Sequence, residues 1–421
     1  MGRLLLVIII SVFIFYSCTP TLKSTFLSNS DISYQEASPQ SYGTRSNPRD
    51  PLAYVPDTNH LEQFPIRQIR VNVHFVNSRD GSKNFNGAEA KEFARVFLKT
   101  ANDKLPKKIK PWLPIGNDLP GLPKRYEYIL TPCSDEPNDI GVYCHYDDEL
   151  YAFVNKGKNR NNYSRAVIKR YGLLKDTVLN IFLMPHHPDS IKSKTYKPHQ
   201  AGIALGSDVK ISGIFNKEKA KPWSFSGVLN HEIGHVLGLH HSWTHDGCDD
   251  TPSHPNCWNK SKKPPCDTMA SNNVMSYNAQ QNSWSPCQIG TIHRNFAKLR
   301  SRQRKLLIRN WCELDERKTI HIETSTHWKG AKDLVSHIII NNGGTLEIDD
   351  RISLPKGAKI TIYPNGQLKL NNNARLHNDC GEVWEGIEIL SDGSRRGKVI
   401  FVGNPKVENV RHDIPSVDAE H

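Results

Sequence analysis

The sequence is short of acidic residues and of hydrophobic residues. It has 43 Asp and Glu against 55 Lys and Arg, a net charge of +12, and only 37% of its 421 residues are hydrophobic. Basic runs occur at residues 104–110, 260–263 and 300–305, but no aromatic residues are interleaved in a recognisable nucleic-acid motif. We therefore expect no nucleic-acid partner and interpret the basic runs as solvated faces of a soluble globular protein.

The strongly apolar segment at the N-terminus predicts export. Arg3 precedes an apolar run over residues 4–15, which is too short to span a bilayer comfortably and fits the hydrophobic part of a secretory signal. Cys18 stands where cleavage is expected, in a segment that resembles a bacterial lipobox. We predict a signal peptide over residues 1–18 and either a cell-envelope lipoprotein, attached to the membrane through lipidated Cys18, or a secreted protein.

Eight further cysteines make disulfides the expected state of an exported chain, because an even number can pair completely. Composition leaves their pairing open. The eight are Cys133, Cys144, Cys248, Cys257, Cys266, Cys287, Cys312 and Cys380.

The order of predicted elements indicates an α+β fold. Residues 19–64 are rich in Ser, Pro, Asn and Thr and read as a linker or pro-segment. Residues 65–312 alternate strand-like and helix-like patterns, with helices expected near 90–101, from 225 to 237, and from Ser285, whose helix should carry an apolar stripe ending at Leu299. Residues 313–421 hold short strand-like pieces between Gly and Asn turns, which fit a partial parallel β-helix or a small β-sandwich.

The sequence HEIGHVLGLHH at residues 231–241 carries the chemistry. On a helix, His231 and His235 lie one turn apart on one face and can hold one zinc ion. A continued helix would carry position 241 about 15 Å along the axis, so the chain has to turn, and Gly238 tolerates the left-handed backbone that a turn needs. His241 then folds back as third ligand, while His240 points elsewhere. Metzincin zinc proteases have this signature.

Two residues downstream complete the predicted site. Met275, in the sequence NVMSY, is the candidate for the Met-turn that packs beneath the histidines. Tyr277 can donate a hydrogen bond to a developing oxyanion, or be an ordinary core tyrosine.

The segment from His231 to Gln288 resembles the pappalysin branch of the metzincins, through HEIGHVLGLHH, the sequence DDTP at 249–252, four loop cysteines, NVMSY and Ser285-Pro286. The resemblance implies a twisted sheet, an active-site helix, a Met-turn and a substrate cleft. It also implies calcium ligands at Asp249, Asp250 and Thr251, and the disulfides Cys248–Cys266 and Cys257–Cys287. Cys287 departs from the family, which usually has glycine there.

We therefore expect a zinc endopeptidase acting on extracellular or periplasmic proteins. Three imidazoles leave the metal a site for water, and Glu232 serves as general base. We place the edge of the cleft, where substrate backbone pairs, at the strand around 209–211. The alternative is a surface adhesion protein that binds through its β-rich tail and carries a vestigial metal site.

Overall fold

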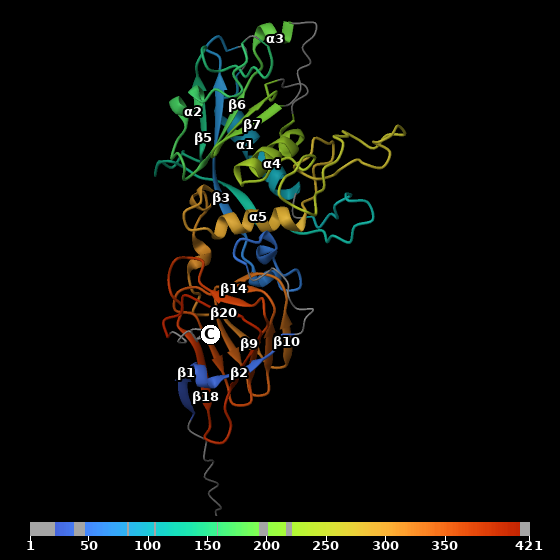
Figure 1. The fold of residues 1–421 in the computed structure, drawn as a ribbon. Coiled ribbons are helices and arrows are strands. Elements are labelled where there is room, and N and C mark those ends of the chain that lie inside the picture. The colour runs from blue at the N-terminus through green and yellow to red at the C-terminus, as the bar shows by residue number, and fades with distance from the viewer. Residues whose placement is uncertain are drawn as a thin grey trace, which may run out of the picture.

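The computed structural model describes residues 22–37, 47–81, 84–104, 107–157, 159–192, 201–215 and 221–412. Figure 1 shows two parts, an upper one of sheet and helices and a lower one of short strands. The predicted signal peptide and Cys18 lie outside the described residues. None of the described helices is long and apolar enough to cross a membrane.

The upper part is built on a six-stranded sheet in the order β4-β3-β6-β8-β7, with β5 also paired to β3. All pairs are parallel except β7 with β8. The alternating apolar residues at 69–75 are fully buried in β3, so this predicted strand is confirmed. The strands are β3 (Arg67–Asn77), β4 (Tyr126–Leu130), β5 (Val142–Tyr146), β6 (Leu179–Met184), β7 (Ala201–Leu205) and β8 (Asp208–Ser212).

Helices cover this sheet because their apolar residues recur at helical spacing. Phe93 and Phe97 of α1 share one core with Leu229 and Ile233 of α4. The described helices are α1 (Gly87–Lys104), α2 (Ala166–Tyr171), α3 (Pro188–Lys192), α4 (Ser226–Val236), α5 (Pro286–Ala297) and α6 (Arg302–Lys305), with 3-10 turns η6 (Pro222–Phe225) and η7 (Asn310–Cys312).

Ser285 caps α5 as predicted, and its hydroxyl accepts a hydrogen bond from the Gln288 N–H at 3.2 Å. The predicted stripe was too long at its other end. The helix ends at Ala297, and Leu299 is 53% exposed.

The lower part, below α5 in Figure 1, consists of three sheets that the chain visits in rotation. Within each sheet, the strand from one turn of the chain pairs in parallel with the strand from the next turn. The expectation of a small β-sandwich is therefore wrong. The strands are β9 (Thr319–Ile322), β10 (Ser325–Trp328), β11 (Lys332–Asp333), β12 (His337–Ile340), β13 (Thr345–Ile348), β14 (Arg351–Ser353), β15 (Lys359–Ile362), β16 (Gln367–Leu370), β17 (Arg375–His377), β18 (Gly386–Ser391), β19 (Lys398–Val402) and β20 (Lys406–Val407).

In-register stacking of apolar residues forms the core of the lower part. Ile338 lies opposite Ile360 on the next turn of the chain, and Ile360 lies opposite Ile387. These side chains are buried, with at most 2% exposure. Each turn therefore covers the apolar side chains of the turn before it.

The described residues of the segment predicted as a linker or pro-segment carry regular structure. β1 (Lys23–Phe26) pairs antiparallel with β18, and β2 (Ile32–Gln35) pairs parallel with β19. The short turns η1 (Asn29–Asp31), η4 (Pro51–Tyr54) and η5 (Leu61–Gln63) follow along the chain. Local composition does not reveal these strands, because their partners lie more than 360 residues away.

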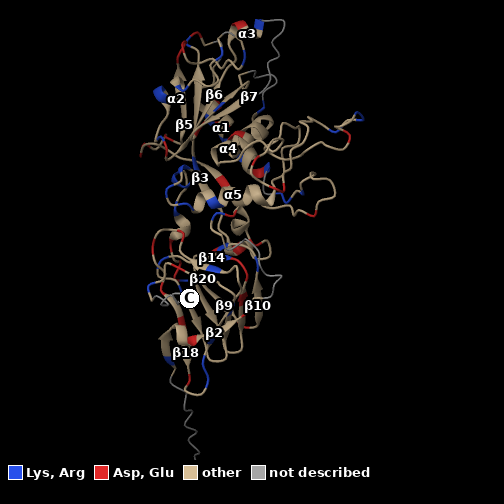
Figure 2. Cartoon of the chain, viewed as in Figure 1, with Lys and Arg blue, Asp and Glu red and all other residues tan. Residues whose placement is uncertain are grey.

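Buried ion pairs join the two parts. Arg67 of β3 and Arg351 of β14 both contact the carboxylate of Asp333, and Lys332 pairs with Asp57. All five side chains are at most 4% exposed. Elsewhere acidic and basic residues are interspersed over both parts (Figure 2).

Among the described residues three disulfides form, and their pairing differs from both expected loop pairs. Cys248 pairs with Cys287, and Cys257 pairs with Cys266. The Asp250 carboxylate accepts a hydrogen bond from the Cys287 N–H at 2.9 Å, so the turn after Cys248 lies against the start of α5. The third disulfide is Cys312–Cys380.

Cys133 and Cys144 are free, so the expectation that all eight cysteines pair is wrong. Their side chains contact different partners. The Tyr143 hydroxyl lies 2.9 Å from the sulfur of Cys133, and the Cys144 thiol donates to the carbonyl of Phe85 at 3.4 Å.

Candidate metal centre

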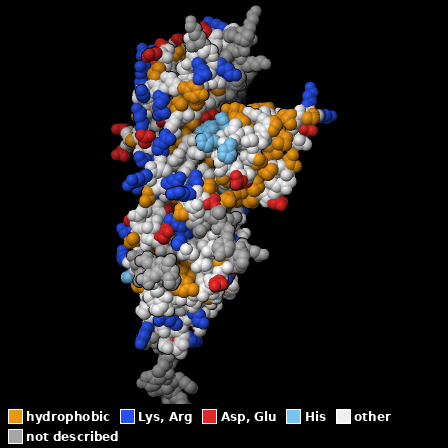
Figure 3. Space-filling model, viewed as in Figure 1, with side chains coloured by type: hydrophobic (Ala, Val, Ile, Leu, Met, Phe, Trp, Pro, Cys, Tyr) orange, Lys and Arg blue, Asp and Glu red, His pale blue; other side chains and the backbone are white. Residues whose placement is uncertain are grey.

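Three histidines converge at the end of α4, as their spacing predicts. The helix ends at Val236, and Gly238 adopts φ +99°, so the chain turns back. The Nε2 atoms of His235 and His241 lie 3.0 Å apart, and one ligand atom of each histidine lies within 4.8 Å of the others. His240 is exposed and takes no part in the group. Figure 3 shows a patch of histidines over the region of α4.

Backbone carbonyls fix two of the rings. The Nδ1 of His231 lies 2.7 Å from the carbonyl of Val274, and that of His235 lies 2.9 Å from the carbonyl of Leu239. A carbonyl only accepts, so each Nδ1 carries the proton and each Nε2 keeps a free lone pair. Trp243, which the sequence analysis did not single out, stacks on His241 with ring centroids 3.9 Å apart.

Burial keeps the imidazoles neutral. Desolvation lowers the pKa of His231 to about 3 and that of His241 to about 4, and it also lowers the pKa of His235. Neutral imidazole is the form that binds metal ions.

Glu232 is buried next to the first histidine, with 7% exposure. Burial raises the pKa of its carboxyl to about 8, and a hydrogen bond from the backbone of Ala204 in β7 opposes that rise. No basic side chain contributes to the shift. The strand passes so close that a Cβ on Gly202 would lie 2.5 Å from Cγ of Glu232. Neither Gly202 nor Ala204 could be found from local sequence, because the contact joins two separate elements.

Met275 and Tyr277 both lie at the histidine group. Met275 is fully buried under α4, and a Cβ on Gly234 would lie 2.4 Å from its sulfur. The Tyr277 ring centroid lies 5.4 Å from that of His231, and its side chain is 48% exposed. Burial, the Glu232 carboxylate and Tyr163 raise the pKa of Tyr277, so its hydroxyl keeps the proton that a donor needs.

The edge of the sheet beside the site is β7, which corrects our placement of the cleft edge at 209–211. Those residues belong to β8, which lies between β6 and β7. The sequence order misled the prediction because β7 and β8 form an antiparallel hairpin, in which the earlier strand takes the outer place.

The loop after the histidines is organised by Asp246. Its carboxylate accepts from the Thr251 hydroxyl at 2.8 Å and from the Cys248 N–H at 3.0 Å. Asp249 is exposed, and one carboxylate oxygen of Asp250 is buried without a hydrogen-bond partner. Calcium binding at Asp249, Asp250 and Thr251 stays a prediction.

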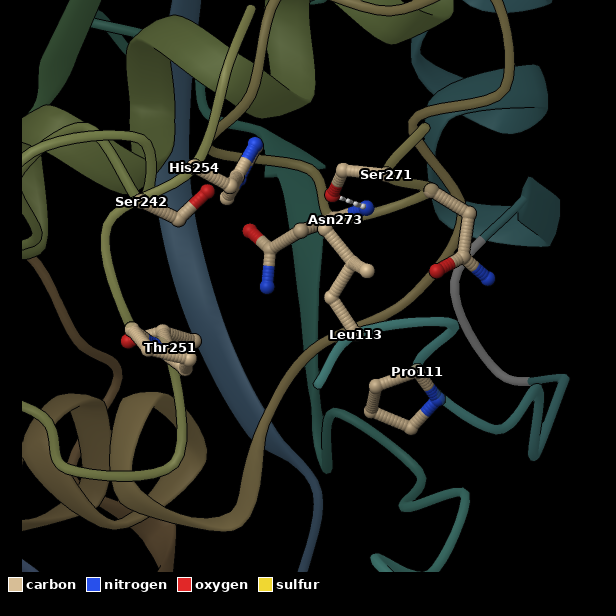
Figure 4. A pocket seen from close by; sticks show the side chains of 9 residues that line it. Pro111, Leu113, Ser242, Thr251, His254, Ser271 and Asn273 are labelled. Atoms are coloured by element: carbon tan, nitrogen blue, oxygen red, sulfur yellow. Dashed lines mark hydrogen bonds between the residues drawn. The ribbon is translucent and has the colours of Figure 1, made fainter. Parts of the chain in front are cut away.

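A small pocket lies between this loop and the segment before Met275 (Figure 4). Its lining contains none of the three histidines. The residues that line it are Pro111, Leu113, Ser242, Thr251, Pro252, His254, Ser271, Asn272 and Asn273.

Three comparisons with known proteins gave one family match and two similar solved structures among those found. No curated protein matches the chain. Two solved structures are similar at 17% identity: mature mirolysin of Tannerella forsythia with a cleaved peptide, covering 57% of this chain and 95% of that one at a TM-score of 0.40, and mirolysin with compound 9, covering 58% and 97% at 0.39. Residues 207–301, which contain all three histidines, match the metallo-peptidase family M12B, Reprolysin-like.

Proposed function

We propose that this chain is a zinc-dependent endopeptidase whose metal ligands are His231, His235 and His241. The observation that carries the proposal is the convergence of three neutral imidazoles, two of them oriented by backbone carbonyls, beside a buried carboxylate. This donor set suits zinc, which takes nitrogen ligands in four-coordinate sites and keeps one position open when it is catalytic.

The electrostatics of Glu232 also fit a bound cation. A buried carboxyl without a basic partner is protonated near neutral pH, and a divalent cation at the adjacent histidines favours its ionised form. A zinc ion in this position supplies a Lewis acid and lowers the pKa of bound water towards about 7.

The residues of the chain then perform the proton transfers. Glu232 accepts a proton from the attacking water as its oxygen bonds to the peptide carbonyl carbon. It returns that proton to the amine nitrogen as the C–N bond breaks. Tyr277, whose ring centroid lies 5.4 Å from that of His231 and 5.2 Å from that of His241, donates a hydrogen bond to the carbonyl oxygen as negative charge develops there.

Edge strand β7 is the element that we propose to hold the substrate. Only β8 pairs with it among the described strands, so its outer side can add an extended peptide through main-chain hydrogen bonds. Ala204 and Gly202 place that peptide beside Glu232.

We extend the proposal to the rest of the molecule. The metalloprotease is of the pappalysin type, and its Met-turn is at Met275. It binds calcium beside Asp250, whose unpartnered buried oxygen supports this. The lower part is a parallel β-helix, in keeping with the rotation of its strands through three sheets. The protein is exported and cleaves extracellular or periplasmic proteins, with Cys18 as a lipid attachment site.

The test is the variant Glu232→Gln. It should retain stoichiometric zinc, since the ligands are unchanged, while cleavage of a peptide mixture falls at least roughly 100-fold. Glu136→Gln, in an exposed loop, is the matched control and should behave as wild type. A chelator should abolish wild-type cleavage, and zinc should restore it. Substantial cleavage by Glu232→Gln would remove the general-base assignment.

A further inference from the structure

The first turn of α4 has a position without a side chain beside the candidate metal centre. Gly227 is four residues before His231, so it lies one turn away on nearly the same helix face. Two polar side chains from other elements meet there. A Cβ on Gly227 would lie 2.6 Å from the side-chain amide oxygen, Oε1, of Gln281 and 3.1 Å from the ammonium nitrogen of Lys104.

Gln281 is held in this place by the segment around Met275. Its amide nitrogen donates to the Ser276 carbonyl at 3.2 Å and lies 3.5 Å from Nδ1 of His231. Its backbone has φ +39°, which fixes the loop in a conformation that few side chains adopt. Gln281 therefore links Gly227 directly to the histidine group.

Lys104 is the unexplained member of this group. It ends α1 and begins a basic run that the sequence predicted to be a solvated face, yet its side chain is half-buried. No acidic residue among those described pairs with it, and burial alone lowers the pKa of its ammonium group. A half-buried cation without a counter-ion is costly, and an arriving carboxylate would remove that cost.

We propose that Lys104 selects substrates with an acidic residue next to the scissile bond. The inference rests on the proposed protease function. One helical turn separates Gly227 from His231, about 5.4 Å, and an extended peptide advances about 3.3 Å per residue. A substrate side chain reaching Lys104 therefore belongs to a residue within two positions of the reacting carbonyl. The side-chain amide of Gln281 donates a hydrogen bond to the substrate side chain or accepts one from it. Its position limits the length of the substrate side chain that fits.

The experiment uses peptides that differ only in having Glu, Gln or Lys at each position flanking one cleavage site. The full chain with zinc should cleave one Glu peptide at least roughly tenfold faster in kcat/KM than its Gln partner, as expected of a close charge pair. Lys104→Met should lose that preference, so that its kcat/KM values for the Glu and Gln peptides become equal. Lys104→Glu should prefer the Lys peptide.

Lys99→Glu is the control for net charge, because Lys99 lies on the same helix with its side chain 64% exposed. It should keep the preference for Glu, and thermal unfolding should show that all variants fold. An acidic preference that survives in Lys104→Met, or an absence of preference in wild type, would overturn this inference and leave the protease function standing. Absence of any chelator-sensitive cleavage by wild type would overturn both.

Discussion

Replacing Gly202 by alanine should disable Glu232 without touching a metal ligand. The added Cβ would lie 2.5 Å from Cγ and 2.7 Å from Oε1 of Glu232, whereas ordinary contacts are 3.4–4 Å. Either the carboxylate or strand β7 must therefore move by roughly 1 Å, and a misplacement of that size in a catalytic site costs about 100-fold in rate. We expect kcat to fall by about that factor.

The assay is steady-state cleavage of one fluorogenic peptide, with zinc content measured on the same samples. Zinc should remain stoichiometric, because the three histidines are unchanged and the carbonyls that orient His231 and His235 belong to Val274 and Leu239, outside β7. Ile203→Val is the matched control, since the next residue of a strand points to the opposite face. A kcat within threefold of wild type for Gly202→Ala would refute the placement of Glu232 against β7, whatever happened to stability.

Three further predictions test the site, the junction and the acid response. His241→Ala should lose zinc on dialysis against a weak chelator, while His240→Ala, which removes an exposed side chain, should keep it; the reverse result would reject the assigned third ligand. Asp333→Ala should lower the free energy of unfolding in urea by about 3–5 kcal/mol, because it leaves two buried arginines without their shared partner. Burial, together with neighbouring His145, lowers the pKa of His74 to about 3. The unfolded chain therefore binds this proton more readily than the folded chain. The free energy of unfolding should fall as the pH drops from about 6.5 towards 3. His74→Gln should reduce this fall in the free energy of unfolding, measured by urea unfolding at a series of pH values.

The sequence predicted well where short-range spacing decides structure. The helix carrying His231 and His235, the turn at Gly238 and the capped start of α5 each depend on residues within one or two turns. A period of 3.6 or a capping pair is visible in any such window. The same reasoning separated His241 from its neighbour His240, because the turn geometry is local.

Several of the failures depend on how separate elements pack together, which a short window of sequence does not show. Which cysteine meets Cys248 depends on where α5 begins relative to the loop, and the family pattern did not supply that for Cys287. The outer place of β7 depends on the hairpin that it forms with β8. Lys104 reads as one lysine in a basic run, and only the packing of α1 against α4 shows that it is half-buried beside Gly227.

The N-terminal strands constrain how the two parts of the molecule work together. β1 and β2 supply the last strands of two lower sheets. The η4 turn that follows lies against α5. A Cβ on Gly290 of that helix would lie only 2.0 Å from the backbone carbonyl oxygen of Pro51. One segment thus contacts both the far end of the lower part and a helix of the upper part. Removing it, as a pro-segment is removed, would expose the edges of β18 and β19 and take Asp57 from buried Lys332. Because those losses fall on the junction and the lower part, the described residues of this segment, 22–37 and 47–64, are structural elements of the folded chain.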